Sequence, residues 1–188
     1  MIIGISGKAG SGKDTVGDYL LRGNLVQAKI PLAKSLKDLC SKLFGIPNDY
    51  MYDNKEKETH IKVTDWLCDN SQLGSERIGT NLTVREVLQY FGTDVVRSFY
   101  SSVWTDMFLR SCKEYDSVVC TDVRFVDEVE AIQKSGGLVI RLTRNTSHMS
   151  HCSENVLDDY KNFDIVYNNI GETPKETCEN IKTILEEL

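Results

Sequence analysis

The sequence predicts an α/β fold, a three-layer α/β/α sandwich built around a mainly parallel β-sheet. Short apolar segments alternate with amphipathic ones along the chain, which is typical of strands joined by helices. The first apolar segment, 2–5, leads directly into a glycine-rich turn and then a helical pattern. The chain has 188 residues, about the length of one domain, so we expect a single domain over 1–188.

The N-terminal elements follow this alternation. We expect a strand at 2–5, a helix at 13–22 that ends at Gly23, and a second strand at 25–30. The next helix ends at Gly45. Its apolar positions follow the helical period and are Leu32, Leu36, Leu39, Cys40 and Leu43.

The segment 46–82 differs from its neighbours. It is polar, it contains the charge run 55–58, and few of its apolar positions are periodic. A solvated loop and a functional arm are both compatible with this composition.

A capping box at Thr83 and Glu86 opens the next helix. Its expected apolar side is Val84, Val87, Leu88, Phe91, Val95 and Phe99. Further strands are expected at 116–121, 138–142 and 164–167, with a helix at 125–135 and a last one from Pro174.

The overall charge limits the classes of ligand. Lys plus Arg number 22 and Asp plus Glu number 28, so the net charge is −6. A chain this acidic lacks the electrostatic footprint of a nucleic-acid binder, and no apolar run could span a membrane.

The first residues do not form a signal peptide, and the six cysteines show no CxxC pair. We therefore expect reduced thiols and a cytoplasmic location.

The glycine-rich turn carries the strongest functional signal. It fits the pattern GxxxxGK between a strand and a helix, the context of a phosphate-binding P-loop. Glycines let backbone N–H groups point at phosphate oxygens, the helix N-terminus adds its dipole, and the lysine reaches the β- and γ-phosphates. The cradle comprises Gly7, Lys8, Ala9, Gly10, Ser11, Gly12 and Lys13.

The residue after the lysine departs from the usual pattern. Asp14 stands where a Ser or Thr hydroxyl normally meets Mg²⁺, and Thr15 follows it. A carboxylate can hold Mg²⁺ directly or through water, or contact another group, whereas the Thr15 hydroxyl suits an α-phosphate better. A GTP switch is disfavoured, because the stretch 122–125 has no glycine and no NKxD motif occurs.

Four polar residues recur at every fourth position of the helix that begins after Thr83. Each step drifts about 40° around the axis, so they form one slanting stripe opposite the apolar side. Two arginines flanking a glutamine can clamp a phosphate and contact a base, although a solvated face is the alternative. Gly92, costly within a helix, indicates a close approach by another group. The stripe comprises Arg85, Gln89, Thr93 and Arg97.

Charged residues also follow two of the expected strands. Asp122 and Arg124 come just after the strand at 116–121, at the sheet edge where ligands of α/β folds bind, and a structural ion pair is the alternative. Arg144 follows the next strand and precedes a polar loop that can close over phosphates.

With these residues in place, the chain resembles the deoxynucleoside monophosphate kinases of tailed bacteriophages. The matching stretches are 4–15, 31–39, 85–97, 121–132 and 151–169. The resemblance implies a P-loop kinase that uses ATP and Mg²⁺ to phosphorylate a deoxynucleoside monophosphate, in the host cytoplasm if phage-encoded. It also implies a monophosphate-binding arm near 46–100 and a short lid near 144–155.

The residues can then be given expected roles. Lys13 and the loop amides hold the phosphates of ATP, and Arg124 and Arg144 neutralise the transferring phosphoryl group. The expected Mg²⁺ shell is Asp14, Thr15 and Asp122. The expected acceptor contacts are Lys37, Arg85, Gln89 and Arg97.

Two other functions stay open at this point. Another small-metabolite P-loop kinase, such as one acting on dephospho-coenzyme A, would carry many of the same signals. A nucleotide-binding module without turnover is the alternative from a different class, although the second anion stripe speaks against it. We expect small-molecule partners and no nucleic acid or membrane, and a homodimer is left open.

Overall fold

The computed structural model describes residues 1–53, 56–58, 60–62, 81–144 and 156–188. The chain divides into two compact units, unit 1 with Met1–Leu32 and Thr105–Leu188, and unit 2 with Ala33–Trp104. The expected lid beyond Arg144, and part of the expected arm, lie outside the described residues. Within the described ranges, no helix is long and apolar enough to cross a bilayer.

Unit 1 contains a five-stranded sheet in the order β2-β5-β1-β6-β7, and all of its strand pairs are parallel. The strands are β1 (Ile2–Gly7), β2 (Ala28–Lys29), β5 (Val118–Val123), β6 (Leu138–Thr143) and β7 (Ile165–Asn168). The strand expected at 25–30 is much shorter than predicted, because only two of its residues pair with β5.

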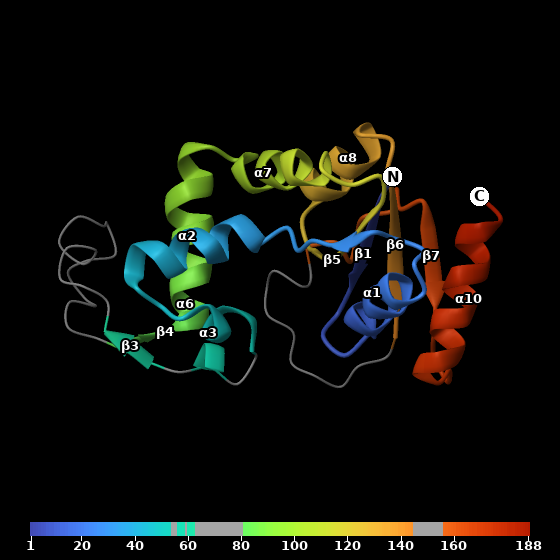
Figure 1. Ribbon diagram of the computed structural model, residues 1–188, viewed down its shortest axis with the longest axis horizontal. Helices are drawn as coiled ribbons and strands as arrows, with labels where there is room; N and C mark the ends of the chain where they lie inside the picture. The colour runs from blue at the N-terminus through green and yellow to red at the C-terminus, as the bar shows by residue number, and fades with distance from the viewer. Residues whose placement is uncertain (54–55, 59, 63–80, 145–155) are drawn as a thin grey trace. The chain divides into compact units, whose positions relative to one another are not determined.

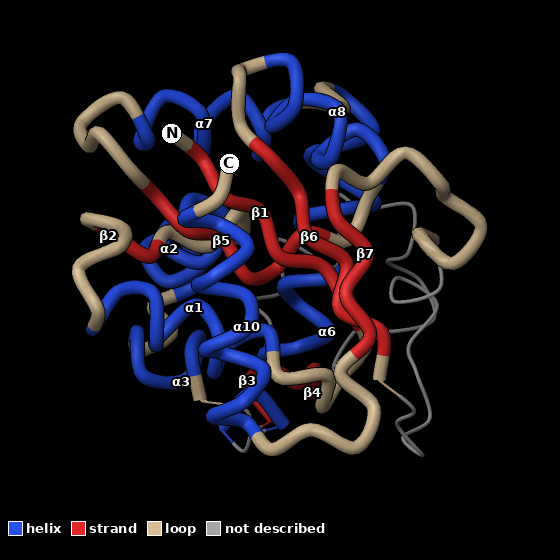
Figure 2. The backbone as a smooth tube through the Cα atoms, turned by 90° about the vertical axis from the view of Figure 1, so that its right-hand side faces the viewer, coloured by secondary structure: helices blue, strands red, loops and turns tan. Residues whose placement is uncertain are grey.

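Helices cover both faces of this sheet (Figures 1 and 2). Helices α1 (Lys13–Arg22) and α10 (Pro174–Glu186) pack on one face, around a core that includes Val16, Leu20 and Ile181. Helices α7 (Val103–Cys112) and α8 (Val126–Lys134) contribute to a second core that includes Phe108 and Ile132. The predicted α/β/α sandwich with a mainly parallel sheet is confirmed.

Unit 2 is mainly helical and has a separate core around Cys40, Met51 and Val84. Its helices are α2 (Lys34–Phe44), α3 (Asn48–Tyr52), the 3-10 turn η1 (Glu56–Glu58), α6 (Val84–Gln89) and the π-helix η2 (Tyr90–Arg97). Strands β3 (His60–Lys62) and β4 (Asn81–Thr83) form an antiparallel pair. The predicted capping box opens α6, with both of its hydrogen bonds formed.

The predicted apolar side of that helix is wrong at its C-terminal end. Phe99 is 94% exposed and Val95 is 37% exposed. The reason is that the α-helix gives way at Tyr90 to a π-helix, whose i→i+5 hydrogen bonds widen each turn and shift every later side chain around the axis. Leu39 and Leu43 of α2, also expected on an apolar face, are 42% and 48% exposed.

The close approach expected at Gly92 is present, but it comes from packing. A Cβ atom at Gly92 would lie 2.5 Å from Leu36 Cδ2, and the Trp104 indole donates to the Gly92 carbonyl at 2.9 Å. The glycine is therefore explained by the core of unit 2 and gives no support to a ligand on the polar stripe.

Candidate active site

The loop between β1 and α1 has the backbone of an anion cradle. Gly10 and Gly12 take positive φ angles of 76° and 94°, which glycine adopts without strain. At Gly7 a Cβ atom would lie 2.5 Å from Ser11 Oγ, so there is no room for a side chain. No side chain caps α1 at Gly12, so the helix N-terminus can present its N–H groups and dipole to a ligand. The loop therefore fits a nucleotide phosphate.

Three cations lie around this loop. Lys13 Nζ donates to the Lys8 carbonyl at 3.0 Å, and Lys8 Nζ pairs with Asp158 at 2.8 Å. Arg144 Nη2 donates to the Glu172 carbonyl at 3.2 Å. A cavity of about 270 Å³ beside the loop brings several predicted residues together. Its lining includes Lys13, Asp14, Thr15, Arg144 and Asn169.

Asn169, just after β7, is a site residue whose role was not predicted from the sequence. Its side chain is buried, and Nδ2 donates to the Ser11 carbonyl in the P-loop at 3.0 Å. The two residues are 158 positions apart, so no local pattern could connect them. Only the matching stretch that ends at 169 singled out this part of the chain.

The substitution Asn169→Ala is expected to loosen the P-loop. It leaves the Ser11 carbonyl without this donor, and a buried group that loses its partner costs about 1–3 kcal/mol in the free energy of unfolding. ATP affinity should fall as well, because the loop amides are less well fixed. Chemical denaturation and calorimetric ATP titration measure the two effects. The exposed neighbour provides a control, Asn168→Ala, and equal losses in both variants would argue against a specific role of Asn169.

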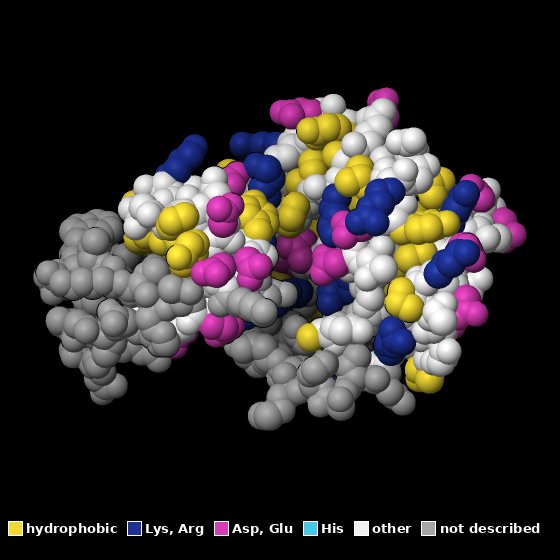
Figure 3. Space-filling model, turned by 60° about the horizontal axis from the view of Figure 1, so that its bottom comes forward, with side chains coloured by type: hydrophobic (Ala, Val, Ile, Leu, Met, Phe, Trp, Pro, Cys, Tyr) yellow, Lys and Arg dark blue, Asp and Glu magenta, His cyan; other side chains and the backbone are white. Residues whose placement is uncertain are grey.

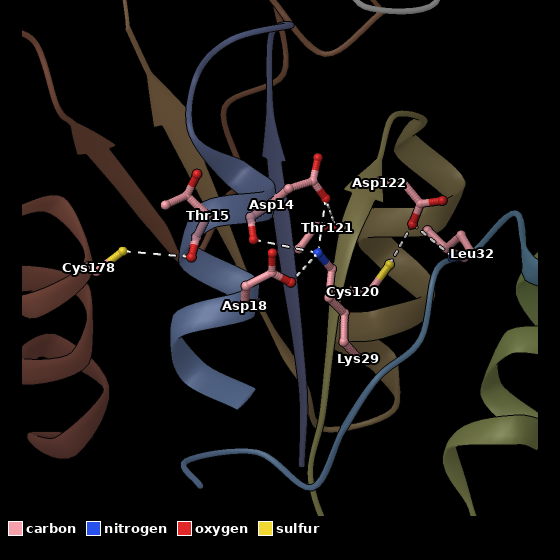
Figure 4. A network of polar contacts seen from close by, with 9 residues as sticks. All are labelled: Asp14, Thr15, Asp18, Lys29, Leu32, Cys120, Thr121, Asp122 and Cys178. Carbon is pink, nitrogen blue, oxygen red and sulfur yellow. Dashed lines mark hydrogen bonds and ion pairs between the residues drawn. The ribbon is translucent and has the colours of Figure 1, made fainter. Parts of the chain in front are cut away.

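Asp14 is held firmly on one side of its carboxylate. Thr121 Oγ1 donates to Asp14 Oδ1 at 2.6 Å, and Lys29 Nζ pairs with the same oxygen at 3.2 Å (Figure 4). Burial raises the pKa of Asp14, but the hydrogen bond from Thr121 and the charge of Lys29 outweigh it, so the pKa lies below its ordinary value. The group is therefore a carboxylate at neutral pH. Neither Lys29 nor Thr121 was singled out from the sequence.

Asp122 lies within β5 and not beyond its end as expected, because that strand extends to Val123. Its Oδ1 accepts hydrogen bonds from the Leu32 N–H at 2.8 Å and the Cys120 thiol at 3.1 Å (Figure 4). Burial raises the pKa of Cys120 well above its ordinary value, so the thiol keeps the proton that it donates. One oxygen of Asp122 thus already has a structural function.

The remaining candidates of unit 1 are more exposed. The Thr15 side chain is exposed, whereas its carbonyl accepts a hydrogen bond from the Cys178 thiol at 3.8 Å. Arg124 follows β5 and is also exposed. The backbone N–H of Arg124 donates to the buried Glu128 carboxylate at 2.7 Å, which fixes the turn into α8. Arg124 is therefore a solvent-facing cation on an anchored backbone.

In unit 2 the expected acceptor residues have protein partners. Arg85 Nε donates to Glu58 at 2.5 Å, and Arg97 Nε donates to the Ser101 carbonyl at 3.2 Å. Lys37 Nζ lies 4.3 Å from the centre of the Tyr52 ring, and Gln89 is half-buried. The wider turns of η2 mean that the slant calculated for the stripe does not hold beyond Gln89.

Lys and Arg side chains are interspersed with Asp and Glu on the face shown in Figure 3. Among the side chains described on that face, the cations do not gather into one large basic patch.

Comparisons with known proteins identify the family of the chain. A model of the deoxynucleotide monophosphate kinase family matches residues 39–175. A protein of Acanthamoeba polyphaga mimivirus, named "Putative deoxynucleotide monophosphate kinase", is 31% identical over 183 aligned residues. That alignment covers 88% of this chain and 86% of the viral protein.

Solved structures of shikimate kinases share the fold. Those from Aquifex aeolicus and Bacteroides thetaiotaomicron both superpose with a TM-score of 0.52, at 14% and 15% identity. They match 99% of this chain and cover 96% and 98% of their own chains. These structures support a P-loop kinase architecture and carry no information about the acceptor.

Proposed function

Because the chain belongs to the deoxynucleotide monophosphate kinase family, we propose that it transfers the γ-phosphate of ATP to a deoxynucleoside monophosphate, giving ADP and the diphosphate. The observation that carries the proposal is the cavity beside the P-loop, where Lys13, Asp14 and Arg144 lie together in a chain of this family.

The proposed roles in unit 1 follow from the chemistry of phosphoryl transfer, which needs positioning and charge neutralisation. Lys13 and the amides of the loop hold the β- and γ-phosphates. Arg144, and Arg124 beside the end of β5, neutralise the transferring group. Asp14, Thr15 and Asp122 would hold Mg²⁺, which supplies further neutralisation of phosphate charge when bound.

Among these three, Asp14 fits the metal best. Among the described residues, the protein partners of its carboxylate all contact Oδ1, and the side chain lines the cavity. Carboxylate oxygen is the ligand type that Mg²⁺ prefers. The Asp122 carboxylate already accepts hydrogen bonds from the Leu32 N–H and the Cys120 thiol, which makes it a weaker candidate for a metal ligand.

We propose unit 2 as the source of the acceptor contacts, within the arm near 46–100. Arg85 and Arg97 would bind the phosphate of the acceptor, Gln89 its base, and Lys37 would assist. Arg85 would have to exchange Glu58 for the substrate, since the two are paired in this structure.

The decisive experiment is a screen of the common ribo- and deoxynucleoside monophosphates with ATP and Mg²⁺, following ADP release. The proposal expects acceptor-dependent ADP formation with at least one deoxynucleotide and weaker turnover with dephospho-coenzyme A. Turnover of dephospho-coenzyme A alone would replace the proposed acceptor. ATP binding without turnover of any acceptor would indicate a nucleotide-binding module.

The substitution Asp14→Asn is expected to lower activity at limiting Mg²⁺ and to recover part of it at high Mg²⁺. The amide keeps the shape of the side chain but loses the charge that would attract the cation. Initial rates across a Mg²⁺ series measure the effect. The matched control is Asp18→Asn, because Asp18 also pairs with Lys29, at 2.8 Å, but does not line the cavity. An Asp14→Asn enzyme with the parental Mg²⁺ dependence would exclude the metal role.

A further inference from the structure

Two residues outside the P-loop hold the carboxylate of Asp14 in one orientation. Thr121, on β5, and Lys29, on β2, both contact Oδ1, at 2.6 Å and 3.2 Å. Figure 4 shows the second oxygen of Asp14 on the side of the carboxylate away from these two partners. Within the described residues, Oδ2 has no protein partner, and Asp14 lines the cavity beside the P-loop.

The position of Thr121 is itself fixed by packing. Its side chain is buried, and a Cβ atom at Gly17 would lie 2.4 Å from Thr121 Cγ2. Helix α1 therefore packs against the methyl group, which leaves the hydroxyl of this β-branched residue facing Asp14. Gly17 allows this contact because it has no side chain, so the close packing of α1 on β5 aligns the hydrogen bond.

Lys29 supplies the charge that makes the arrangement stable. Its Nζ pairs with Asp18 at 2.8 Å as well as with Asp14, so one ammonium lies between two carboxylates of α1 (Figure 4). The Lys29 side chain is 20% exposed, whereas that of Asp14 is 75% exposed, so the ammonium is shielded from water while the carboxylate stays open to a ligand. The repulsion between Asp14 and Asp18 is thereby relieved without occupying Asp14 Oδ2.

We propose that Thr121, supported by Lys29, is a positioning residue that holds Asp14 Oδ1 so that Oδ2 faces the Mg²⁺ accompanying ATP. The proposal rests on the nucleotide use of the proposed function. An unheld carboxylate rotates freely about its last torsion, and that freedom is lost when a metal binds. Partners that orient a ligating group commonly change metal affinity by about 10–100-fold when they are removed.

Two substitutions at Thr121 separate positioning from packing. Thr121→Val keeps a methyl group against Gly17 but removes the hydroxyl, whereas Thr121→Ser keeps the hydroxyl and removes the methyl. A positioning role affects the valine variant and spares the serine variant. If Thr121 acts through packing alone, the serine variant should be affected and the valine variant should be spared. The matched control is Thr183→Val on α10, where the hydroxyl donates to the Glu179 carbonyl of the same helix.

The test is calorimetric ATP binding without any acceptor, in EDTA and across a series of free Mg²⁺ concentrations. For Thr121→Val we expect the free Mg²⁺ needed for half of the affinity gain to rise about ten-fold, with the Kd for ATP in EDTA unchanged. Thr121→Ser and Thr183→Val should stay within about two-fold of the parent. Circular dichroism confirms that each variant is folded.

The proposal is overturned if the ATP affinity of Thr121→Val depends on Mg²⁺ as that of the parent does. It is also overturned if the valine and serine variants lose this dependence equally, or if the ATP affinity of the parent does not depend on Mg²⁺. If the Thr121→Val protein does not fold, the same titrations are made with Thr121→Ala and Thr121→Ser. Only the alanine variant should then lose the gain in ATP affinity that Mg²⁺ gives.

These outcomes are independent of the acceptor screen. Binding of ATP without an acceptor does not depend on which monophosphate is phosphorylated. A protein that turns over no deoxynucleotide but shows the Thr121 effect would refute the proposed function alone. An active kinase without the Thr121 effect would refute this inference alone.

Discussion

The Lys13→Ala protein is expected to fold normally and to lose about 10²–10³ in kcat, the usual cost of removing one preorganised cation from a site of developing charge. The lysine head group donates to the Lys8 carbonyl within the loop, and Lys13 is not part of the hydrophobic cores. Its removal should therefore leave the thermal midpoint nearly unchanged. Steady-state rates with saturating ATP and acceptor, together with thermal denaturation, measure both quantities.

A second lysine gives the control for charge alone. Lys134→Ala removes an exposed lysine of α8 that pairs with Glu130 one turn away, and an exposed pair of this kind contributes little. Its kcat should match the parent. A folded Lys13→Ala enzyme with a near-parental kcat would contradict the P-loop mechanism, because that mechanism assigns the contact with the β- and γ-phosphates to this lysine.

Local patterns in the sequence predicted several helices in both units well. Helix α1 has the predicted bounds, since an uninterrupted helical period runs from Lys13 to Arg22. Thr83 and Thr173 cap their helices with both hydrogen bonds of the predicted boxes, because the residues of a capping box lie three apart. Where structure is decided within a few neighbouring residues, the sequence is sufficient.

Contacts between distant residues limited the prediction of the site. Thr121 reaches Asp14 across 107 positions, and Asn169 reaches Ser11 across 158. Such pairs depend on the strand order β5-β1-β6-β7, which no single pattern in the chain reveals. The P-loop could be recognised because its residues are contiguous, whereas the side chains that fix it could not.

The π-helix η2 is a different kind of limit. Its residues, Tyr90–Arg97, continue the apolar period of α6 in sequence, and nothing in their types marks a change from i→i+4 to i→i+5 hydrogen bonds. The change alters which side chains share a face, as the exposure of Phe99 shows. Arg97, at the end of η2, is therefore the acceptor residue whose role most needs a direct test.

Arg97→Ala is expected to raise the KM for the acceptor by roughly ten-fold or more, because a charge-assisted hydrogen bond to phosphate is worth about 1.5–3 kcal/mol. The KM for ATP should move far less, since Lys13 and the amides of the loop bind that ligand in unit 1 and Arg97 belongs to unit 2. Initial rates that vary one substrate at saturating levels of the other separate the two constants.

The shape of the side chain should matter as well as its charge. In the structure the Ser101 carbonyl accepts a hydrogen bond from Arg97 Nε, which orients the planar guanidinium. Arg97→Lys should therefore recover only part of the acceptor affinity, because an ammonium cannot reproduce the two parallel hydrogen bonds of the fork. Arg110→Ala, which removes an exposed arginine of α7, controls for net charge. Equal shifts in both KM values, or a shift for ATP alone, would remove Arg97 from the acceptor site and with it the assignment of unit 2 to acceptor binding.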